Sequence, residues 1–151
     1  MNLVFKPLEK NSERSARKLI ESGLEGRWGS YDPSFNPDVN DLLSTYGCNC
    51  LTAWDNNQLI GVGCWYFKTK ETAVICRMSV HVSYRRKNIG SRILAALEKE
   101  IKLQSVKNIE LETTSEWKEV IQFYLSNGYQ KSHEWKGDTY FSKDLTAQDV
   151  S

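Results

Sequence analysis

The chain lacks any long apolar run. Its longest apolar stretch interrupted only by glycine is Leu59–Phe67, nine residues, whereas a membrane-spanning helix needs about 20. The first residues, Met1–Pro7, also lack the basic segment followed by an apolar stretch that marks a secretory signal. The sequence therefore predicts no membrane partner and a cytoplasmic location.

An excess of one sign of charge is absent as well. Lys and Arg number 20 and Asp and Glu 19, which gives a formal net charge of +1 at pH 7. Such a balance creates no global field that would attract nucleic acid or an anionic membrane. We expect no nucleic-acid partner, and any site for an anion has to be local.

Cysteine is sparse, and its spacing is not that of a zinc site. Cys48 and Cys50 are separated by one residue, while Cys64 and Cys76 lie in strand-like apolar runs. Zinc sites usually begin with two cysteines spaced by two to four residues and a matching second pair. We therefore expect no metal and reduced, buried thiols. A catalytic thiol is the alternative.

Repeats, low-complexity tracts and Pro- or Gly-rich linkers are missing too, so one domain over residues 1–151 is expected. Apolar spacing and turn residues predict a mixed α/β domain (α+β) that is neither doubly wound nor an all-β sandwich. The expected elements are a strand at Leu3–Phe5, a helix behind Ser12 that ends at Gly23, a helix from Asn36 through Tyr46, an antiparallel meander of Cys50–Trp54, Leu59–Lys68 and Thr72–Val82, a helix over Ile89–Leu103, a strand at Ile109–Thr113, a helix at Trp117–Ser126 and a hairpin of Tyr129–Trp135 with Thr139–Lys143.

Positive charge gathers where the third meander strand meets the next helix. Arg85, Arg86, Lys87 and Arg92 lie at this junction, where unpaired backbone N–H groups and the helix dipole attract phosphate. The motifs of nucleoside-triphosphate and dinucleotide sites are missing, because Gly90 is the only glycine here. The junction therefore predicts a different kind of anion site, and a solvated basic loop is the alternative.

Two patches resemble the GNAT superfamily of acyl-CoA N-acyltransferases. In that family a strand is followed by [Gln/Arg]-x-x-Gly-x-[Gly/Ala] and a helix, and here Met78–Val80 and Arg85–Gly90 take these places. The second patch, Leu111–Thr113 followed by Tyr124 and by Gly128-Tyr129, is similar to the family's late strand and its helix ending in Tyr-x-x-x-Gly-[Phe/Tyr]. The resemblance covers nearly the whole chain. It implies a central mixed, mostly antiparallel sheet flanked by helices, with strands splayed at the cofactor site.

The resemblance implies acetyl-CoA as the acyl donor. Its pyrophosphate would rest on backbone N–H groups of the loop, and its pantetheine amides would pair with the end of the strand. The residues that this implies for cofactor binding are Met78, Ser79, Val80, Arg85, Arg86, Lys87, Asn88, Ile89, Gly90 and Ser91.

The resemblance also implies direct acetyl transfer to a primary amine, without a metal or a covalent intermediate. Tyr124 takes the place of a general acid that protonates the leaving thiolate, and core packing is the alternative for this side chain. Glu112 takes the place of a general base, with Glu110, His81 or water as alternatives. The amine acceptor is small or peptidic: a protein N-terminus, a lysine side chain, a polyamine or an amino sugar.

Two positions depart from the family pattern. Asn88 replaces the first glycine of the loop, although asparagine tolerates left-handed backbone, and Trp117 replaces an asparagine that helps to hold the cofactor in many members. These departures leave two rivals to the enzyme: a non-catalytic acyl-CoA-binding regulatory module, and an interaction domain without a CoA site.

Two further features bear on partners. The segment Arg27–Asp38 is rich in aromatic and turn residues, and we consider two roles for it: selection of the amine, or a connection whose Asp residues cap a helix and whose aromatics fill the core. An exposed late strand favours a homodimer.

Overall fold

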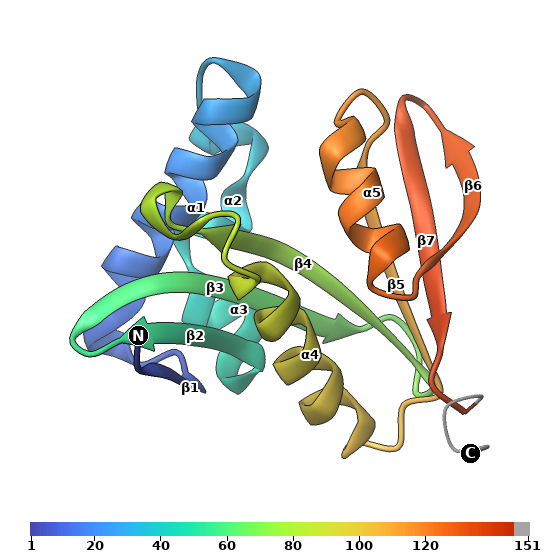
Figure 1. Cartoon of the computed structure of the whole chain (residues 1–151), viewed down its shortest axis with the longest axis horizontal. Helices are drawn as coiled ribbons and strands as arrows, with labels where there is room; N and C mark the ends of the chain where they lie inside the picture. The colour runs from blue at the N-terminus through green and yellow to red at the C-terminus, as the bar shows by residue number, and fades with distance from the viewer. Residues whose placement is uncertain (147–151) are drawn as a thin grey trace. The chain divides into compact units, whose positions relative to one another are not determined.

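The structure is a computed structural model that describes residues 1–146. The chain forms two compact units, the first from Met1–Trp65 and Arg77–Leu97, the second from Tyr66–Cys76 and the chain from Glu98 onward. Seven strands are ordered β1-β2-β3-β4-β5-β7-β6, and β3 and β4 run through both units (Figure 1). A single domain stays a prediction from length and composition.

The strands of the first unit follow the predicted order. β1 (Leu3–Pro7) pairs antiparallel with β2 (Cys50–Asp55), which pairs antiparallel with β3 (Gln58–Phe67). The turn between β2 and β3 uses Asn56 at φ 54°, a left-handed conformation that asparagine tolerates. β4 (Thr72–Val80) ends two residues earlier than predicted, because His81 leads directly into the 3₁₀ helix η4 (Val82–Tyr84).

The first helix is longer than predicted. α1 spans Glu13–Trp28 and stops at Gly29, whose φ of 81° requires glycine. The prediction that Gly23 ends this helix is wrong. A Cβ at Gly23 would lie 2.7 Å from Ser79 Oγ, so this glycine allows α1 to approach β4 closely.

The second predicted helix is interrupted. It divides into α2 (Pro37–Asn40) and α3 (Leu42–Tyr46) because Asp41 leaves helical geometry at φ −138° and ψ 61°. The Glu13 carboxylate accepts the Leu43 N–H at 3.0 Å and so satisfies one free donor of the new helix start. Val39 and Leu42, which lie on either side of the break, are both completely buried.

The α4 helix (Ile89–Lys102) lies directly on the backbone of β3. A Cβ at Gly61 or Gly63 would come within 2.4 Å of Ile93 and 2.7 Å of Leu97 respectively, so the two glycines make room for this helix. Ile93 and Leu97 are almost fully buried there. This close packing fixes the start of α4, where the predicted anion site lies.

The second unit carries the other three strands. β5 (Asn108–Thr114) pairs antiparallel with β7 (Asp138–Asp144), and β7 forms the predicted hairpin with β6 (Gln130–Trp135). β4 and β5 pair in parallel over three residues, Thr72–Val74 against Asn108–Glu110. Trp117 is the N-cap of α5 (Lys118–Ser126) rather than its first residue. The ring of Tyr124 from α5 packs on Phe141 of β7 at 5.6 Å.

The predicted class, a mixed α/β domain with a mostly antiparallel sheet, is confirmed. Within residues 1–146, no helix is both long and apolar enough to cross a membrane.

Candidate active site

The predicted cofactor residues lie in two runs, Met78–Val80 and Arg85–Ser91, and all ten belong to the first unit. The end of β4 is held on both faces. Met78 lies beside Gly63 of β3, at 3.3 Å from the position of a Cβ there, and Ser79 donates a hydrogen bond of 3.1 Å to the Leu19 carbonyl of α1. The side chains of Met78 and Ser79 are therefore used for packing, as expected if a ligand meets this strand through its backbone.

The loop between η4 and α4 contains two left-handed residues. Arg86 has φ 64° and Asn88 has φ 61°, and the Asn88 carbonyl accepts the Arg92 N–H at 3.1 Å. This bond makes Asn88 the residue that starts α4, so the next N–H groups lack partners within the helix. Left-handed residues in a loop turn backbone N–H groups toward a common centre, an arrangement that binds anions.

Asn88 therefore adopts the conformation that a glycine at this position would favour. We expect Asn88→Gly to preserve acetyl-CoA binding, and Asn88→Val to weaken it roughly tenfold, because a β-branched residue at φ near 60° costs ~1–2 kcal/mol. Isothermal titration calorimetry of both variants tests this expectation. Equal affinities for the Gly and Val variants would show that the left-handed turn is not needed.

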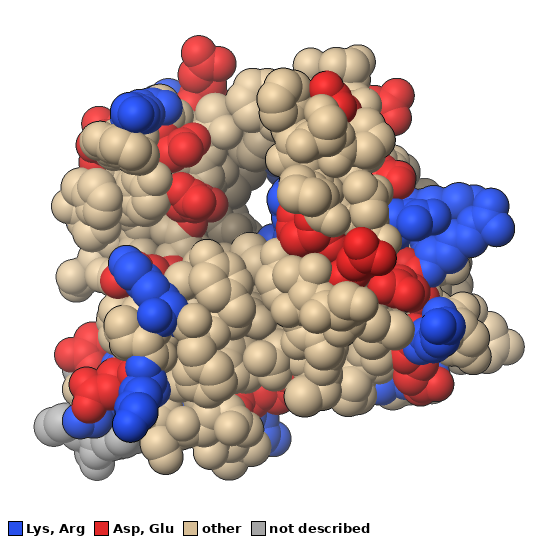
Figure 2. Space-filling model, turned by 180° about the vertical axis from the view of Figure 1, so that it is seen from behind, with Lys and Arg blue, Asp and Glu red and all other residues tan. Residues whose placement is uncertain are grey.

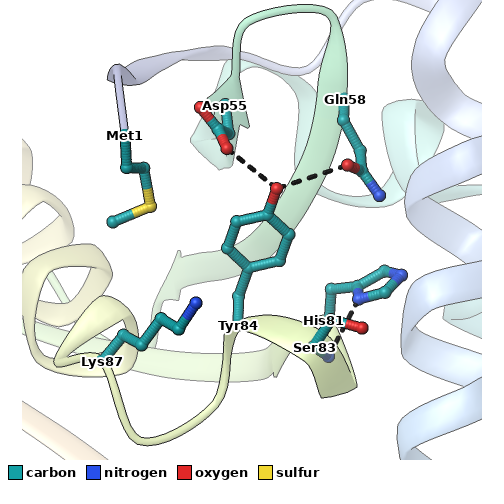
Figure 3. A pocket seen from close by; sticks show the side chains of 7 residues that line it. All are labelled: Met1, Asp55, Gln58, His81, Ser83, Tyr84 and Lys87. Atoms are coloured by element: carbon teal, nitrogen blue, oxygen red, sulfur yellow. Dashed lines mark hydrogen bonds between the residues drawn. The ribbon is translucent and has the colours of Figure 1, made fainter.

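Tyr84 ties this loop to the hairpin of β2 and β3. Its hydroxyl donates hydrogen bonds to Asp55 at 2.8 Å and to Gln58 at 3.3 Å, as Figure 3 shows. The contact with Tyr84 is the main cause that lowers the pKa of Asp55. The Asp55 carboxylate is therefore charged at any pH above the ordinary pKa of Asp. The stabilisation from this contact is lost only as the pH falls through the lowered pKa.

Removing this tether tests its role in holding the loop. Tyr84→Phe keeps the ring but loses both hydrogen bonds, so we expect the KM for acetyl-CoA to rise a few-fold, roughly two- to fivefold for an exposed contact, with kcat unchanged. Steady-state kinetics at saturating acceptor measures both constants. An unchanged KM would mean that the loop holds its shape without Tyr84.

Tyr84, Asp55 and His81 line one pocket (Figure 3), in which His81 has a structural role. Its Nδ1 accepts the Ser83 N–H at 3.1 Å, which caps η4, and its ring meets the Tyr84 ring edge-on at 5.8 Å. The alternative in which His81 is the base therefore requires the other ring nitrogen.

The basic residues of the loop are exposed. Arg85, Arg86 and Lys87 all face solvent, and Arg85 Nε donates back to the Val80 carbonyl at 3.3 Å. Figure 2 shows basic and acidic side chains distributed together over one face of the molecule.

Arg77 is a feature that the sequence analysis missed. It lies inside β4, directly before Met78, with φ 55°. Its guanidinium donates two hydrogen bonds of 2.8 Å to Asp38, which also accepts one of 2.6 Å from Tyr46. Burial raises the pKa of Asp38, but the bonds from Arg77 and Tyr46 outweigh it, and the pKa falls below its ordinary value. No sequence pattern signals this kink in the strand.

These contacts bear on the segment Arg27–Asp38. Asp38 is engaged by Arg77, and Asp32 caps a short 3₁₀ helix by accepting the Ser34 N–H at 2.9 Å. Both carboxylates therefore have structural partners. Phe35 is 81% exposed, so the interpretation that the aromatics of this segment fill the core is wrong for this residue. Amine selection by the segment stays a prediction.

The predicted catalytic residues lie in the second unit. Tyr124 is 9% exposed, and its ring contacts those of Phe123, Tyr129 and Phe141 at centroid distances of 5.3, 6.0 and 5.6 Å. The helix end behind it explains the Tyr-x-x-x-Gly-Tyr pattern. Tyr129 N–H bonds to the Tyr124 carbonyl and Gly128 N–H to that of Leu125, with Gly128 at φ 90°. These are the two bonds of a Schellman motif.

Glu112 and Glu110 lie on the same face of β5, as predicted from their spacing, but their surroundings differ. Glu110 is bound by Lys68 at 2.8 Å. Glu112 is exposed and accepts a hydrogen bond from the Tyr140 hydroxyl. Glu112 is therefore the more accessible of the two candidate bases.

Trp117 helps to start α5, because its carbonyl accepts the N–H groups of Val120 and Ile121 at 3.1 Å.

Across residues 1–146, no group of three or more His, Cys, Asp or Glu side chains could hold a metal ion. Cys50 and Cys64 are buried, lie opposite each other across β2 and β3, and carry reduced thiols.

Comparison with known proteins decides the family. Residues 16–129 match the Acetyltransferase (GNAT) family. The chain belongs to the GNAT acetyltransferase family. This confirms the resemblance inferred from the two sequence patches, both of which fall within the matched range.

The relatives of this GNAT chain are distant in sequence. A GNAT acetyltransferase from Staphylococcus aureus has a similar fold, with a TM-score of 0.86 at 17% identity over 95% of this chain and 99% of that one. The PaiA N-acetyltransferase of Thermoplasma acidophilum, in complex with coenzyme A, has a TM-score of 0.81 at 17% identity over 96% of this chain and 100% of that one. The uncharacterized protein YxbD of Bacillus subtilis is 25% identical over 118 residues, 76% of this chain and 69% of its own.

Proposed function

We propose that this protein is an N-acetyltransferase that moves the acetyl group of acetyl-CoA directly to a primary amine. The observation that carries the proposal is the start of α4, where left-handed Arg86 and Asn88 precede free N–H groups in a member of the GNAT family. The coenzyme A bound by the Thermoplasma relative supports the same choice of donor. A cytoplasmic location remains the prediction made from the sequence.

The residues present fit a pyrophosphate. The N–H groups from Arg86 to Ser91 lie at the positive end of the α4 dipole, and the loop adds exposed cationic side chains. Backbone donors require a backbone shape rather than particular side chains, which explains how Asn88 replaces glycine. The half-buried backbone of Met78–Val80 is proposed to pair with the amides of the donor.

Bound acetyl-CoA supplies the thioester carbon that the amine attacks, so that a C–N bond forms and the C–S bond breaks. Tyr124 is proposed to donate its hydroxyl proton to the leaving sulfur. Glu112 is proposed to accept the proton that the amine loses, directly or through water. A lysine-like amine needs this help most, because its deprotonation at pH 7 costs about 4.6 kcal/mol against about 1.4 for an α-amine.

An amine panel tests the proposal. The purified chain is given acetyl-CoA with a peptide N-terminus, a blocked lysine, a polyamine or an amino sugar, and free thiol and acetylated product are measured. The proposal expects one or more amines to release thiol and gain one acetyl group each. Binding of acetyl-CoA without product from any amine would favour the non-catalytic acyl-CoA-binding module instead.

A homodimer is a separate proposal. β6 is an edge strand, and all six of its residues are exposed, so it offers free backbone groups to a second strand.

A further inference from the structure

Three side chains from three strands form a row beside the proposed base. Glu112 of β5 lies opposite Tyr140 of β7, and Tyr140 lies opposite His133 of β6. Directly opposite residues in antiparallel strands share a face, with Cβ atoms about 5 Å apart. The register of the sheet therefore places Glu112, Tyr140 and His133 side by side.

Specific contacts join the row. The Tyr140 hydroxyl donates a hydrogen bond to the Glu112 carboxylate. The Tyr140 ring stacks on the His133 ring, with centroids 4.4 Å apart and planes at 4°. Stacking leaves the phenol little freedom to turn away from Glu112, so each member of the row restrains the next.

An irregularity in β6 creates the stack. The register shifts between Lys131 and His133, so Ser132 is an extra residue and His133 faces Tyr140. The Ser132 hydroxyl donates to the Tyr140 carbonyl at 3.1 Å and lies 3.0 Å from His133 Nδ1. A regular strand would place Ser132 opposite Tyr140, and no ring would then support the phenol.

We propose that Tyr140, held in place by His133, positions the Glu112 carboxylate for its work as the base. This inference rests on the proposed function. An exposed glutamate has several rotatable bonds and loses considerable entropy when it is ordered, and Tyr140 supplies that order before the amine arrives. A carboxylate has acceptor sites to spare, so the bond from Tyr140 leaves room for the amine or a water.

Other charged and titratable groups face this row. Tyr66 of β3 lies near Glu112 and near Cys76 of β4, and Asp138 lies near Tyr140 on β7. Glu110 is the neighbour on β5 and is neutralised by Lys68. Tyr140 is joined to Glu112 by a hydrogen bond, so it is the residue chosen for substitution.

A double-mutant cycle tests the proposal. Glu112→Gln, Tyr140→Phe and the double variant are assayed for transfer to the best amine of the panel. We expect Tyr140→Phe to lower kcat roughly tenfold when Glu112 is present and to change nothing when Gln occupies that position. The KM for acetyl-CoA and the calorimetric affinity should stay unchanged in all variants.

One further readout separates positioning from simple stability. His133→Phe, which keeps a stacking ring, should retain activity that His133→Ala loses. Ser142→Ala is the control, because Ser142 lies opposite Glu110 in the neighbouring row. This variant should keep the transfer rate of the native protein.

The outcomes are distinguishable. If Glu112→Gln leaves transfer intact, the proposed base is wrong and the positioning role fails with it. If Glu112→Gln lowers kcat but Tyr140→Phe does not, or if Tyr140→Phe lowers kcat by the same factor with Gln at position 112, the positioning role alone is overturned. If no amine is acetylated, the proposed function itself fails.

Discussion

Replacement of Tyr124 by phenylalanine is expected to lower kcat by ~10²–10⁴-fold, the usual contribution of a positioned general acid. The substitution removes one oxygen and keeps the ring contacts with Phe123, Tyr129 and Phe141. Acetyl-CoA affinity and thermal stability should therefore change little. Steady-state rates of thiol release, with calorimetry on the same samples, measure these quantities.

Tyr129→Phe is the matched control for this experiment. Tyr129 is a buried neighbour whose hydroxyl donates to Glu98 at 2.7 Å. Burial and the Glu98 carboxylate raise its pKa above the ordinary tyrosine value, so the hydroxyl keeps its proton. We expect its loss to reduce stability and to spare kcat. A Tyr124→Phe variant that is as active as the native protein would leave Tyr124 as a core aromatic.

A large loss of stability is expected from Glu98→Ala. Glu98 and Lys143 form an ion pair of 3.2 Å whose side chains are 18% and 14% exposed, and Tyr129 donates to the same carboxylate. Removing one partner of a buried pair leaves the other charge uncompensated, which costs ~3–5 kcal/mol. Urea unfolding should show a decrease near the lower end of that range, because Lys143 keeps its bond of 3.1 Å to the Asn127 carbonyl.

Glu71→Ala provides the comparison. Glu71 pairs with Lys107 at the same distance, 3.2 Å, but the two side chains are 64% and 60% exposed. Exposed pairs contribute ~0–1 kcal/mol, so this variant should unfold almost as the native protein does. Equal losses in the two variants would contradict a structural role for the buried pair.

The sequence could predict elements whose signals are local. The spacing of Ile89, Ile93 and Leu97 predicts α4, and Asn127-Gly128 predicts the end of α5, because both depend on residues within a few positions of each other. The left-handed turn before α4 could also be predicted, since the tolerance of asparagine for left-handed backbone is a property of Asn88 itself.

Features set by distant contacts could not be predicted. Gly23 looks like a helix end, yet it is a glycine because Ser79, far along the chain, lies against it. The left-handed kink at Arg77 is held by Asp38. The row that includes Tyr140 depends on strand register and on an extra residue in β6, and neither leaves a periodic trace in the sequence.

The account depends most on acetyl-CoA binding at the start of α4. Calorimetric titration of the native chain with acetyl-CoA, beside Gly90→Glu and Gly26→Glu, tests it directly. Gly90→Glu places a negative charge and a side chain among the loop N–H groups. Gly26→Glu adds the same charge in α1, where a Cβ would meet nothing within 4 Å. We expect saturable binding by the native chain and Gly26→Glu, and loss of binding by Gly90→Glu. Absence of binding by the native chain at millimolar acetyl-CoA, or unchanged binding by Gly90→Glu, would contradict the account.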